Sequence, residues 1–212
     1  MEERNGKTLP ASQGRGTEEL HKKRYRKYRL VSALGRLIEL KDPHVARHCS
    51  SVARIANAIG KELNLSPRKM QDLEKGALLH DIGKIMVDSS VLNDKDTLTD
   101  QEILQIKNHP ENGMRILSMF AFEERITDVA WHHHEAWDGS GYPDGLPCTR
   151  IPQLTRIVSI ADALDAMLED RPYRKHLTDE QITAEIEKGK GTQFDPQICD
   201  IVIYLIRKNK LL

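Results

Sequence analysis

The stretch Gly76-Ala77-Leu78-Leu79-His80-Asp81-Ile82-Gly83-Lys84 places two adjacent metal-binding side chains and a lysine directly after an apolar run. The apolar run predicts a buried helix, and polar groups at its end are costly unless an ion compensates them. An aspartate can bridge two cations through its two oxygens, and a histidine supplies a nitrogen ligand. If the helix continued, Lys84 would face the same way as His80, and its charge would suit a phosphate. The alternative is a capping aspartate beside an ordinary buried histidine, so the interpretation depends on further ligands elsewhere.

The composition favours one α-helical domain. The chain has 212 residues with 32 basic and 32 acidic side chains, and this balance gives no indication of a nucleic-acid-binding protein. Aromatic residues make up only 5%, and long alternating β-branched runs are missing, which disfavours a β-rich fold. Three cysteines without a CxxC motif indicate free thiols in a reducing compartment. Because we find no signal peptide and no apolar run long enough for a membrane span, we expect a cytoplasmic protein.

The first part of the chain is predicted to be a leader followed by one helix. Residues 1–17 have the polar composition of a disordered leader. Residues 18–41 are predicted to form an amphipathic helix whose basic start, His21 to Arg29, lies in solvent. Binding of nucleic acid or of an acidic membrane surface through this basic run is the minor alternative. The helix could also pair two chains into a homodimer through a coiled-coil-like contact.

Capping residues predict where later helices begin. They are Asp42, Ser66, Thr99, Thr178 and Asp195. The helix after Asp42 carries His44 and His48 one turn apart, and two imidazoles with this spacing can reach a common metal site. His109 stands before Pro110, at a predicted helix boundary where its side chain is available as a ligand.

A second polar cluster follows the apolar helix predicted for Ile126 to Trp131. Three consecutive histidines, His132 to His134, favour metal binding. Neighbouring helical positions point about 100° apart, so two ligands are the expected number. The loop from Trp137 to Gly145 is rich in glycine, which permits a ligand to approach the backbone closely. Tyr142 in this loop offers a stacking face or a hydroxyl.

Two aspartates and a basic cluster complete the candidate site. Asp162 and Asp165 lie one turn apart on the most apolar predicted helix, Ile151 to Leu168, where a carboxylate is costly without a cation. We interpret them as one metal ligand and one supporting partner. The cluster Arg171 to Lys175 would hold phosphate or guanine if it lay near a metal; elsewhere it would be a solvated helix end.

Together these segments supply seven imidazole or carboxylate groups and no thiolate. They are His48, His80, Asp81, His109, His133, His134 and Asp162. Such donors suit Fe, Mn or a similar metal in a multinuclear hydrolytic centre better than a structural zinc. Two metals about 3.5–4 Å apart would hold a bridging hydroxide and clamp phosphoryl oxygens for in-line displacement.

Several motifs stand in the order of a known family. They are HDIGK at His80 to Lys84, HHE at His133 to Glu135, GSGYPDG at Gly139 to Gly145, IADALDA at Ile160 to Ala166, RPYRK at Arg171 to Lys175 and GTQFDP at Gly191 to Pro196. On these motifs the chain resembles the HD-GYP domains, a branch of the HD phosphohydrolase superfamily. The resemblance implies an all-α fold, with an HD-domain helical bundle, a GYP loop and additional C-terminal helices. It assigns residues 42–212 to the HD-GYP catalytic domain.

The resemblance also implies an activity. HD-GYP domains hydrolyse the bacterial second messenger cyclic di-GMP to pGpG and often on to GMP. The seven groups match ligands of two or three divalent ions, Fe or Mn, with Asp81 as the bridging ligand. Lys84 would steady the bridging hydroxide and the scissile phosphate, and His132 and Asp165 would support the ligands without binding metal. The residues expected to hold guanine and phosphate are Gly141, Tyr142, Pro143, Arg171 and Arg174.

One position departs from the family pattern. Members with a third metal have an acidic residue one turn before the first ligand histidine, and this sequence has His44 there. An imidazole can still ligate, so His44 is the candidate ligand of a third metal.

Two alternatives to this function stay open. The substrate could be a mixed cyclic GMP-AMP dinucleotide. The chain could also be a signalling module that works by contacting diguanylate cyclase (GGDEF) domains, with catalysis secondary.

Overall fold

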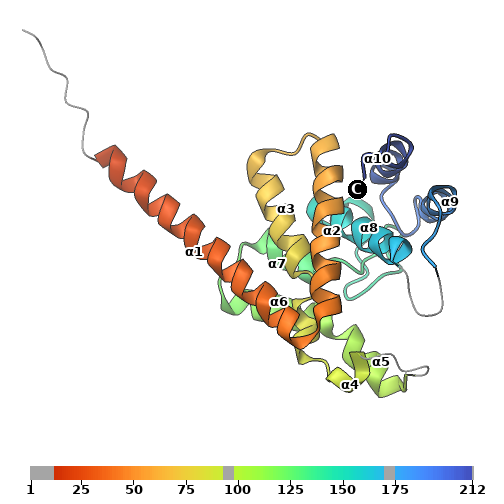
Figure 1. Cartoon of the computed structure of the whole chain (residues 1–212), viewed down its shortest axis with the longest axis horizontal. Coiled ribbons are helices and arrows are strands. Elements are labelled where there is room, and N and C mark those ends of the chain that lie inside the picture. The colour runs from red at the N-terminus through yellow and green to blue at the C-terminus, as the bar shows by residue number, and fades with distance from the viewer. Residues whose placement is uncertain (1–11, 93–97, 170–174, 212) are drawn as a thin grey trace, which may run out of the picture.

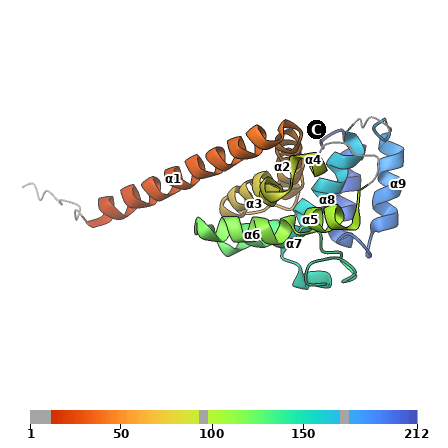
Figure 2. The same cartoon turned by 90° about the horizontal axis from the view of Figure 1, so that it is seen from below.

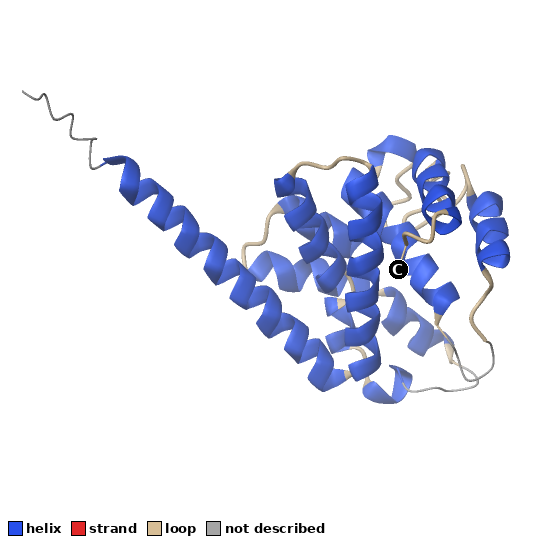
Figure 3. Ribbon diagram, turned by 45° about the horizontal axis from the view of Figure 1, so that its top comes forward, coloured by secondary structure: helices blue, strands red, loops and turns tan. Residues whose placement is uncertain are grey.

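A computed structural model describes residues 12–92, 98–169 and 175–211 of the chain, with side chains from residue 25 onward. Within these ranges every regular element is a helix, apart from an isolated bridge between Lys190 and Phe194 (Figure 3). The predicted all-α fold is therefore confirmed.

The α-helices are α1 (Ser12–Lys41), α2 (Pro43–Glu62), α3 (Pro67–Leu79), α4 (Ser89–Leu92), α5 (Asp100–Lys107), α6 (His109–Met119), α7 (Glu124–His132), α8 (Gln153–Leu168), α9 (Asp179–Gly189) and α10 (Pro196–Arg207). Two short 3-10 helices are η1 (Ile82–Met86) and η2 (Cys148–Arg150).

Helix α1 is a long arm that leaves the body of the molecule (Figure 1). It begins at Ser12, inside the segment that we assigned to a disordered leader, and so it is longer than predicted. Extending a helix is cheap once one part is fixed by packing, because each added residue closes one more hydrogen bond. The fixed part is the end near the body, where Val31, Leu34 and Ile38 are buried.

The capping residues confirm the predicted helix starts. The Asp42 side chain accepts hydrogen bonds from the backbone N–H groups of His44 and Val45, with Pro43 in the first turn of α2. Ser66 caps α3, and Thr99 and Thr178 form capping boxes at α5 and α9. Asp195 caps α10 through the N–H of Gln197. These local contacts set the helix boundaries independently of tertiary packing.

Two apolar clusters hold the helices together. The larger one joins α2, α3 and α8 with α9 and α10, and includes Ile55, Ile160 and Val202. The smaller one joins α1, α3, η1, α6 and α7. Figure 2 shows α1 leaving at one end of the body and α9 lying at the other. Ala77 belongs to the larger cluster and Ile82 to the smaller one, so the His80-Asp81 pair between them lies where the clusters meet.

Helix α3 ends at the His80-Asp81 pair, as the sequence predicted. Its last residue is Leu79, His80 is its C-terminal cap, and η1 begins at Ile82. Lys84 therefore does not follow His80 by a further α-helical turn, as we had considered. It lies instead in a tighter 3-10 turn, in which the Lys84 N–H donates to the Asp81 carbonyl oxygen at 2.9 Å.

Among the helices that the structure describes, none combines the length and the apolar composition that crossing a bilayer would require.

Candidate metal centre

Asp81 lies at the middle of the predicted ligands, and its two carboxylate oxygens face different groups. Oδ2 lies 3.7 Å from His48 Nε2 and 3.5 Å from His80 Nε2. Oδ1 lies 3.2 Å from His109 Nε2 and 3.9 Å from His133 Nε2. The ligand atoms fall into two compact groups, one of His48, His80 and Asp162 and one of His109, His133 and His134. Asp81 stands between the two groups.

Three of these imidazoles are fixed by a backbone carbonyl. The Nδ1 atoms of His80, His109 and His133 lie 2.7, 2.6 and 3.0 Å from the carbonyl oxygens of Ala77, Ile106 and Ala130. Because a carbonyl only accepts, each Nδ1 carries the proton and each Nε2 presents a lone pair. All three Nε2 atoms then act as acceptors at the centre of the site.

The resulting arrangement fits a metal ion. Nε2 of His109 and Nε2 of His133 lie 3.1 Å apart with no proton between them, given the tautomers that the carbonyls select. Nε2 of His80 is buried and has no hydrogen-bond partner. Facing lone pairs and an orphaned buried acceptor are costly by themselves, and a cation satisfies both. The donor set of imidazoles and carboxylates suits a divalent transition metal.

His48 is held in a different way, by carboxylates. Its Nδ1 donates to Asp165 Oδ2 at 2.6 Å, and its Nε2 lies 3.0 Å from Asp162 Oδ1. Asp165 thus orients His48 from behind, as carboxylates commonly do for metal-ligating histidines. This is the supporting place expected for Asp165 from the sequence.

The histidines of the centre differ in the direction in which their pKa values are shifted. Burial, together with the neighbouring imidazoles, lowers the pKa of His133 well below its usual value, and burial and His109 lower the pKa of His134 to about 4. Burial also lowers the pKa of His80. In His48 burial acts in the same direction, but the hydrogen bonds to Asp162 and Asp165 outweigh it and raise the pKa to about 10. Neutral imidazoles are the form that binds metal, so a metal at His48 would have to displace the proton from its Nε2.

Lys84 supplies the nearest positive charge. Its Nζ donates to Asp81 Oδ2 at 2.6 Å, and its side chain is partly exposed. Burial would raise the pKa of Asp81, yet the ammonium group of Lys84 opposes it, and that pKa is held well below the usual range. Asp81 therefore stays ionised beside a partly exposed lysine.

A cavity of about 650 Å³ adjoins the centre. Its wall includes His133, His134 and Asp162, then Gly141 and Tyr142 of the GYP loop. The Tyr142 ring stacks on His134, with ring centroids 4.9 Å apart and planes 20° apart. His134 is a candidate metal ligand, and Tyr142 is a candidate substrate contact. Because both line the cavity, a substrate bound there would lie next to the metal.

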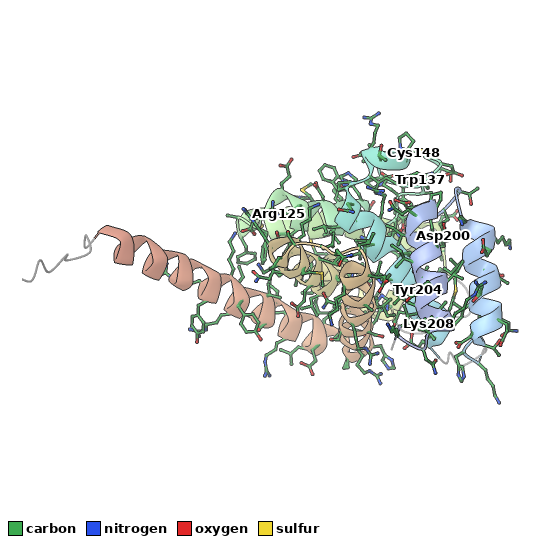
Figure 4. The ribbon with its side chains drawn as sticks, turned by 90° about the horizontal axis from the view of Figure 1, so that it is seen from above. Arg125, Trp137, Cys148, Asp200, Tyr204 and Lys208 are labelled. Carbon is green, nitrogen blue, oxygen red and sulfur yellow. The ribbon has the colours of Figure 1, made fainter. Side chains whose placement is uncertain are left out.

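The GYP loop and the GTQFDP segment are joined through the backbone. The N–H groups of Trp137 and Asp138 donate to the carbonyl oxygens of Gln193 and Thr192. Trp137 and Cys148 lie close together at the base of the loop, where the Cys148 N–H donates to the Trp137 carbonyl oxygen (Figure 4). The loop is thereby anchored at both ends, although it has no regular structure.

Other candidates lie apart from the centre or outside the described residues. His44 is exposed and contacts Arg47, with its Nδ1 2.9 Å from the guanidinium, and it joins none of the clusters of ligand atoms. Pro143 is exposed and follows a cis peptide bond after Tyr142. Arg171 and Arg174 lie outside the described residues.

Some residues of the site were not assigned from the sequence. Thr192 and Gln193 line the cavity, although the GTQFDP motif had been given no role. Lys107 lies at the end of α5 with its Nζ 5.9 Å from the centroid of the Tyr142 ring. Glu135 is buried at the base of the GYP loop. The motifs could have directed attention to Gln193 and Glu135, whereas nothing in the local sequence marks Lys107.

The fold and the centre define an all-α domain in which histidines and aspartates from five segments form a metal-type site. The HD domain family model matches residues 32–198, and the chain belongs to this family. The resemblance to HD-GYP phosphodiesterases expected from the motifs is confirmed. HD-domain phosphohydrolases bind divalent metals, and the clusters of ligand atoms in this chain are able to do so.

The similar curated proteins are named as phosphodiesterases of cyclic dinucleotides. The chain is 37% identical over 177 residues to the cyclic di-GMP phosphodiesterase response regulator RpfG of Xanthomonas campestris pv. campestris, covering 82% of this chain and 46% of the relative. It is 34% identical to a cyclic di-GMP phosphodiesterase of Thermotoga maritima, covering 84% and 49%. It is 33% identical to the 3'3'-cGAMP-specific phosphodiesterase 3 of Vibrio cholerae, covering 79% and 36%. The chain spans about half or less of the length of these relatives.

Solved structures confirm the fold. The cyclic GMP-AMP specific phosphodiesterase V-cGAP3 of V. cholerae superposes with a TM-score of 0.64 at 21% identity, covering 86% of this chain and 49% of the other. The HD domain of the L. monocytogenes phosphodiesterase PgpH in complex with cyclic-di-AMP gives a TM-score of 0.63 at 20% identity, covering 84% and 94%.

Proposed function

We propose that the protein is a metal-dependent phosphodiesterase that hydrolyses cyclic di-GMP to pGpG. The observation that carries the proposal is the placement of Asp81 between two groups of ligand atoms, with Lys84 on one of its oxygens. The names of the most similar relatives support the same substrate class.

The proposed ligands are His48, His80, Asp81, His109, His133, His134 and Asp162, and the proposed metal is Fe or Mn. When bound, such ions polarise a phosphoryl oxygen and lower the pKa of a coordinated water. The backbone carbonyls keep the protons on Nδ1 of His80, His109 and His133, so that the Nε2 atoms stay available as ligands. Because of the position of its ammonium group, Lys84 is expected to hold a non-bridging phosphate oxygen, and Tyr142 to contact a guanine.

Four further residues were assigned to the substrate, and His44 to a third metal. Gly141 lines the cavity and can let a nucleotide approach the loop backbone, whereas Pro143, Arg171 and Arg174 stay predictions. A third metal at His44 would require this side chain to leave Arg47 and turn toward the centre. We therefore favour two metals.

The test is hydrolysis of cyclic di-GMP by protein reconstituted without oxygen with Fe(II) or Mn(II), with pGpG and GMP measured separately. Turnover is expected in the wild type and in Asp88→Ala, whose aspartate is exposed, and is expected to vanish in Asp81→Ala. Metal-loaded, folded wild-type protein without turnover on this substrate would contradict the proposal.

A mixed cyclic GMP-AMP dinucleotide is the second candidate substrate. It is favoured by the name of the V. cholerae relative, to which this chain is 33% identical. Competition between the two dinucleotides in one assay measures the ratio of their kcat/KM values, and that ratio decides between the candidates.

We also propose that two copies of the chain pair through α1. Ala33, Leu37 and Leu40 are exposed at a spacing of three to four residues, which suits a coiled-coil seam. Leu37→Glu with Leu40→Glu is expected to convert a dimer into a monomer in sedimentation equilibrium. A wild-type protein that sediments as a monomer at high concentration would contradict the pairing. Contact with GGDEF domains and a cytoplasmic location stay predictions.

A further inference from the structure

Four consecutive residues at the C-terminal end of helix α7, His132 to Glu135, divide between two roles. His133 and His134 face the candidate metal centre. The residues on either side of this pair, His132 and Glu135, are also buried, but their contacts go to the GYP loop. The proposed metal chemistry uses neither of them.

Glu135 binds the loop through both of its carboxylate oxygens. Oε1 accepts the N–H of Asp144 at 2.7 Å, and Oε2 accepts the N–H of Leu146 at 3.0 Å. Glu135 is only 3% exposed, so water does not compete for these bonds. Hydrogen bonds from backbone N–H groups to an ionised carboxylate are the stronger kind. Both oxygens of Glu135 therefore have a backbone N–H partner from the loop.

Asp144 is held a second time, through its side chain. Nε2 of His132 donates to Asp144 Oδ2 at 3.0 Å, and the His132 ring stacks on Trp131 with planes 4° apart. The same loop residue is thus tied to the end of α7 by its backbone through Glu135 and by its carboxylate through His132.

The loop lies directly on the Glu135 backbone. A Cβ built on Gly141 would lie 2.2 Å from the Ala136 nitrogen and 2.5 Å from the Glu135 Cα, so only glycine permits this approach. The next residue, Tyr142, donates its N–H to the His134 carbonyl oxygen at 3.2 Å, and its ring stacks on the His134 imidazole. The Glu135 contacts therefore fix one side of a short loop whose other side carries Tyr142 at the cavity.

We propose that Glu135 is a positioning residue, which holds the GYP loop so that Tyr142 stays stacked on His134 beside the cavity. Only one part of this proposal, the effect of Glu135 on substrate binding, rests on the proposed phosphodiesterase function. The geometric part, that the Glu135 carboxylate holds residues 141–146 in place, stands by itself and can be measured without substrate.

The test compares Glu135→Gln with the wild type and with Glu185→Gln, which changes an exposed glutamate on α9. The glutamine oxygen can accept a hydrogen bond from one of the two backbone N–H groups. The glutamine NH2 group then faces the other N–H group, and because both are donors no hydrogen bond forms there. The amides of Asp144 and Leu146 are expected to exchange their hydrogens roughly tenfold faster or more in Glu135→Gln, since a charge-assisted bond is lost. The amide of Val129 in α7 and the bound metal content are expected to stay unchanged. Glu185→Gln is expected to match the wild type throughout.

Kinetics separate a positioning role from a general structural one. Glu135→Gln is expected to raise KM for the cyclic dinucleotide more than it lowers kcat, and to cause little further loss in a Tyr142→Ala background. Additive losses in the double variant, loss of metal, or unchanged exchange at Asp144 and Leu146 would each overturn the proposal. If Glu135→Gln does not fold, Glu135→Asp keeps the charge, shortens the reach, and is held to the same criteria.

The two proposals fail in different ways. Wild-type protein that hydrolyses no cyclic dinucleotide would refute the phosphodiesterase, while the hydrogen-exchange comparison would still decide whether Glu135 holds the loop. Normal turnover in the wild type with unchanged exchange in Glu135→Gln would refute only the role of Glu135.

Discussion

Gly83, the fourth residue of the HDIGK motif, lets η1 lie against α6. A Cβ on Gly83 would lie 1.9 Å from the carbonyl oxygen of His109 and 2.6 Å from the backbone nitrogen of Gly113. Gly83→Ala must therefore separate Asp81 from His109, and overpacking of this kind costs about 1–3 kcal/mol. We expect the free energy of unfolding to fall by at least about that amount, as measured by urea denaturation, and metal to bind less tightly in a titration.

Gly35 provides the matched control for this substitution. It lies within α1, and a Cβ placed on it meets no atom within 4 Å. Gly35→Ala is expected to be neutral or to stabilise the protein by about 0.4–1 kcal/mol, because alanine favours the helix. Equal unfolding midpoints for the two variants would show that the approach of η1 to α6 is not tight in solution.

Among the secondary-structure elements, α2 depends on its first turn, because it presents His48 one turn later. Asp42 accepts the N–H groups of His44 at 2.8 Å and Val45 at 3.4 Å, and so satisfies donors that have no partner within the helix. Asp42→Ala is expected to lower the free energy of unfolding by about 1 kcal/mol, since this is the usual cost of losing an N-cap.

The opposite end of α2 offers a control for the loss of a carboxylate. Glu62 is the last residue of the helix and is exposed, and it caps nothing there. Glu62→Ala is expected to change the urea midpoint little. If the midpoint falls as far in Glu62→Ala as in Asp42→Ala, the loss reflects net charge and not the cap.

The elements also show what the sequence could predict. The caps at Asp42 and Thr99 were predictable because a cap is a contact between residues two or three apart. The candidate ligands were predictable because histidines and aspartates next to or within apolar helices are costly without a cation. Two features were not: the turn into η1 at Ile82, and the wrapping of the GYP loop around Glu135. The turn into η1 depends on its packing against α6, a distant segment. The wrapping of the loop depends on hydrogen bonds between Glu135 and residues nine and eleven positions later. Contacts of this kind leave no local pattern in the sequence.

At the level of the whole molecule, the proposed ligands connect helices that otherwise belong to two apolar clusters. His48 comes from α2, and the His80-Asp81 pair from the junction of α3 and η1. His109 begins α6, His133 follows α7, and Asp162 lies in α8. Without a cation, the facing Nε2 atoms of His109 and His133 and the unpartnered Nε2 of His80 oppose this assembly. A metal would turn a destabilising junction into a stabilising one.

Metal removal should therefore lower the stability of the entire domain and not only its activity. A ligand that binds the native state at a free concentration one hundred times its Kd contributes about 2.7 kcal/mol. For a domain of this size, that corresponds to a change in Tm of about 5–10 °C. Calorimetry of metal-loaded protein before and after a chelator should show this fall, and re-addition of Mn(II) should reverse it. Asp81→Ala is expected to unfold at one temperature under all three conditions. A wild-type Tm that does not respond to the chelator, in protein shown to have lost its metal, would mean that the apolar clusters alone hold the ligands in place.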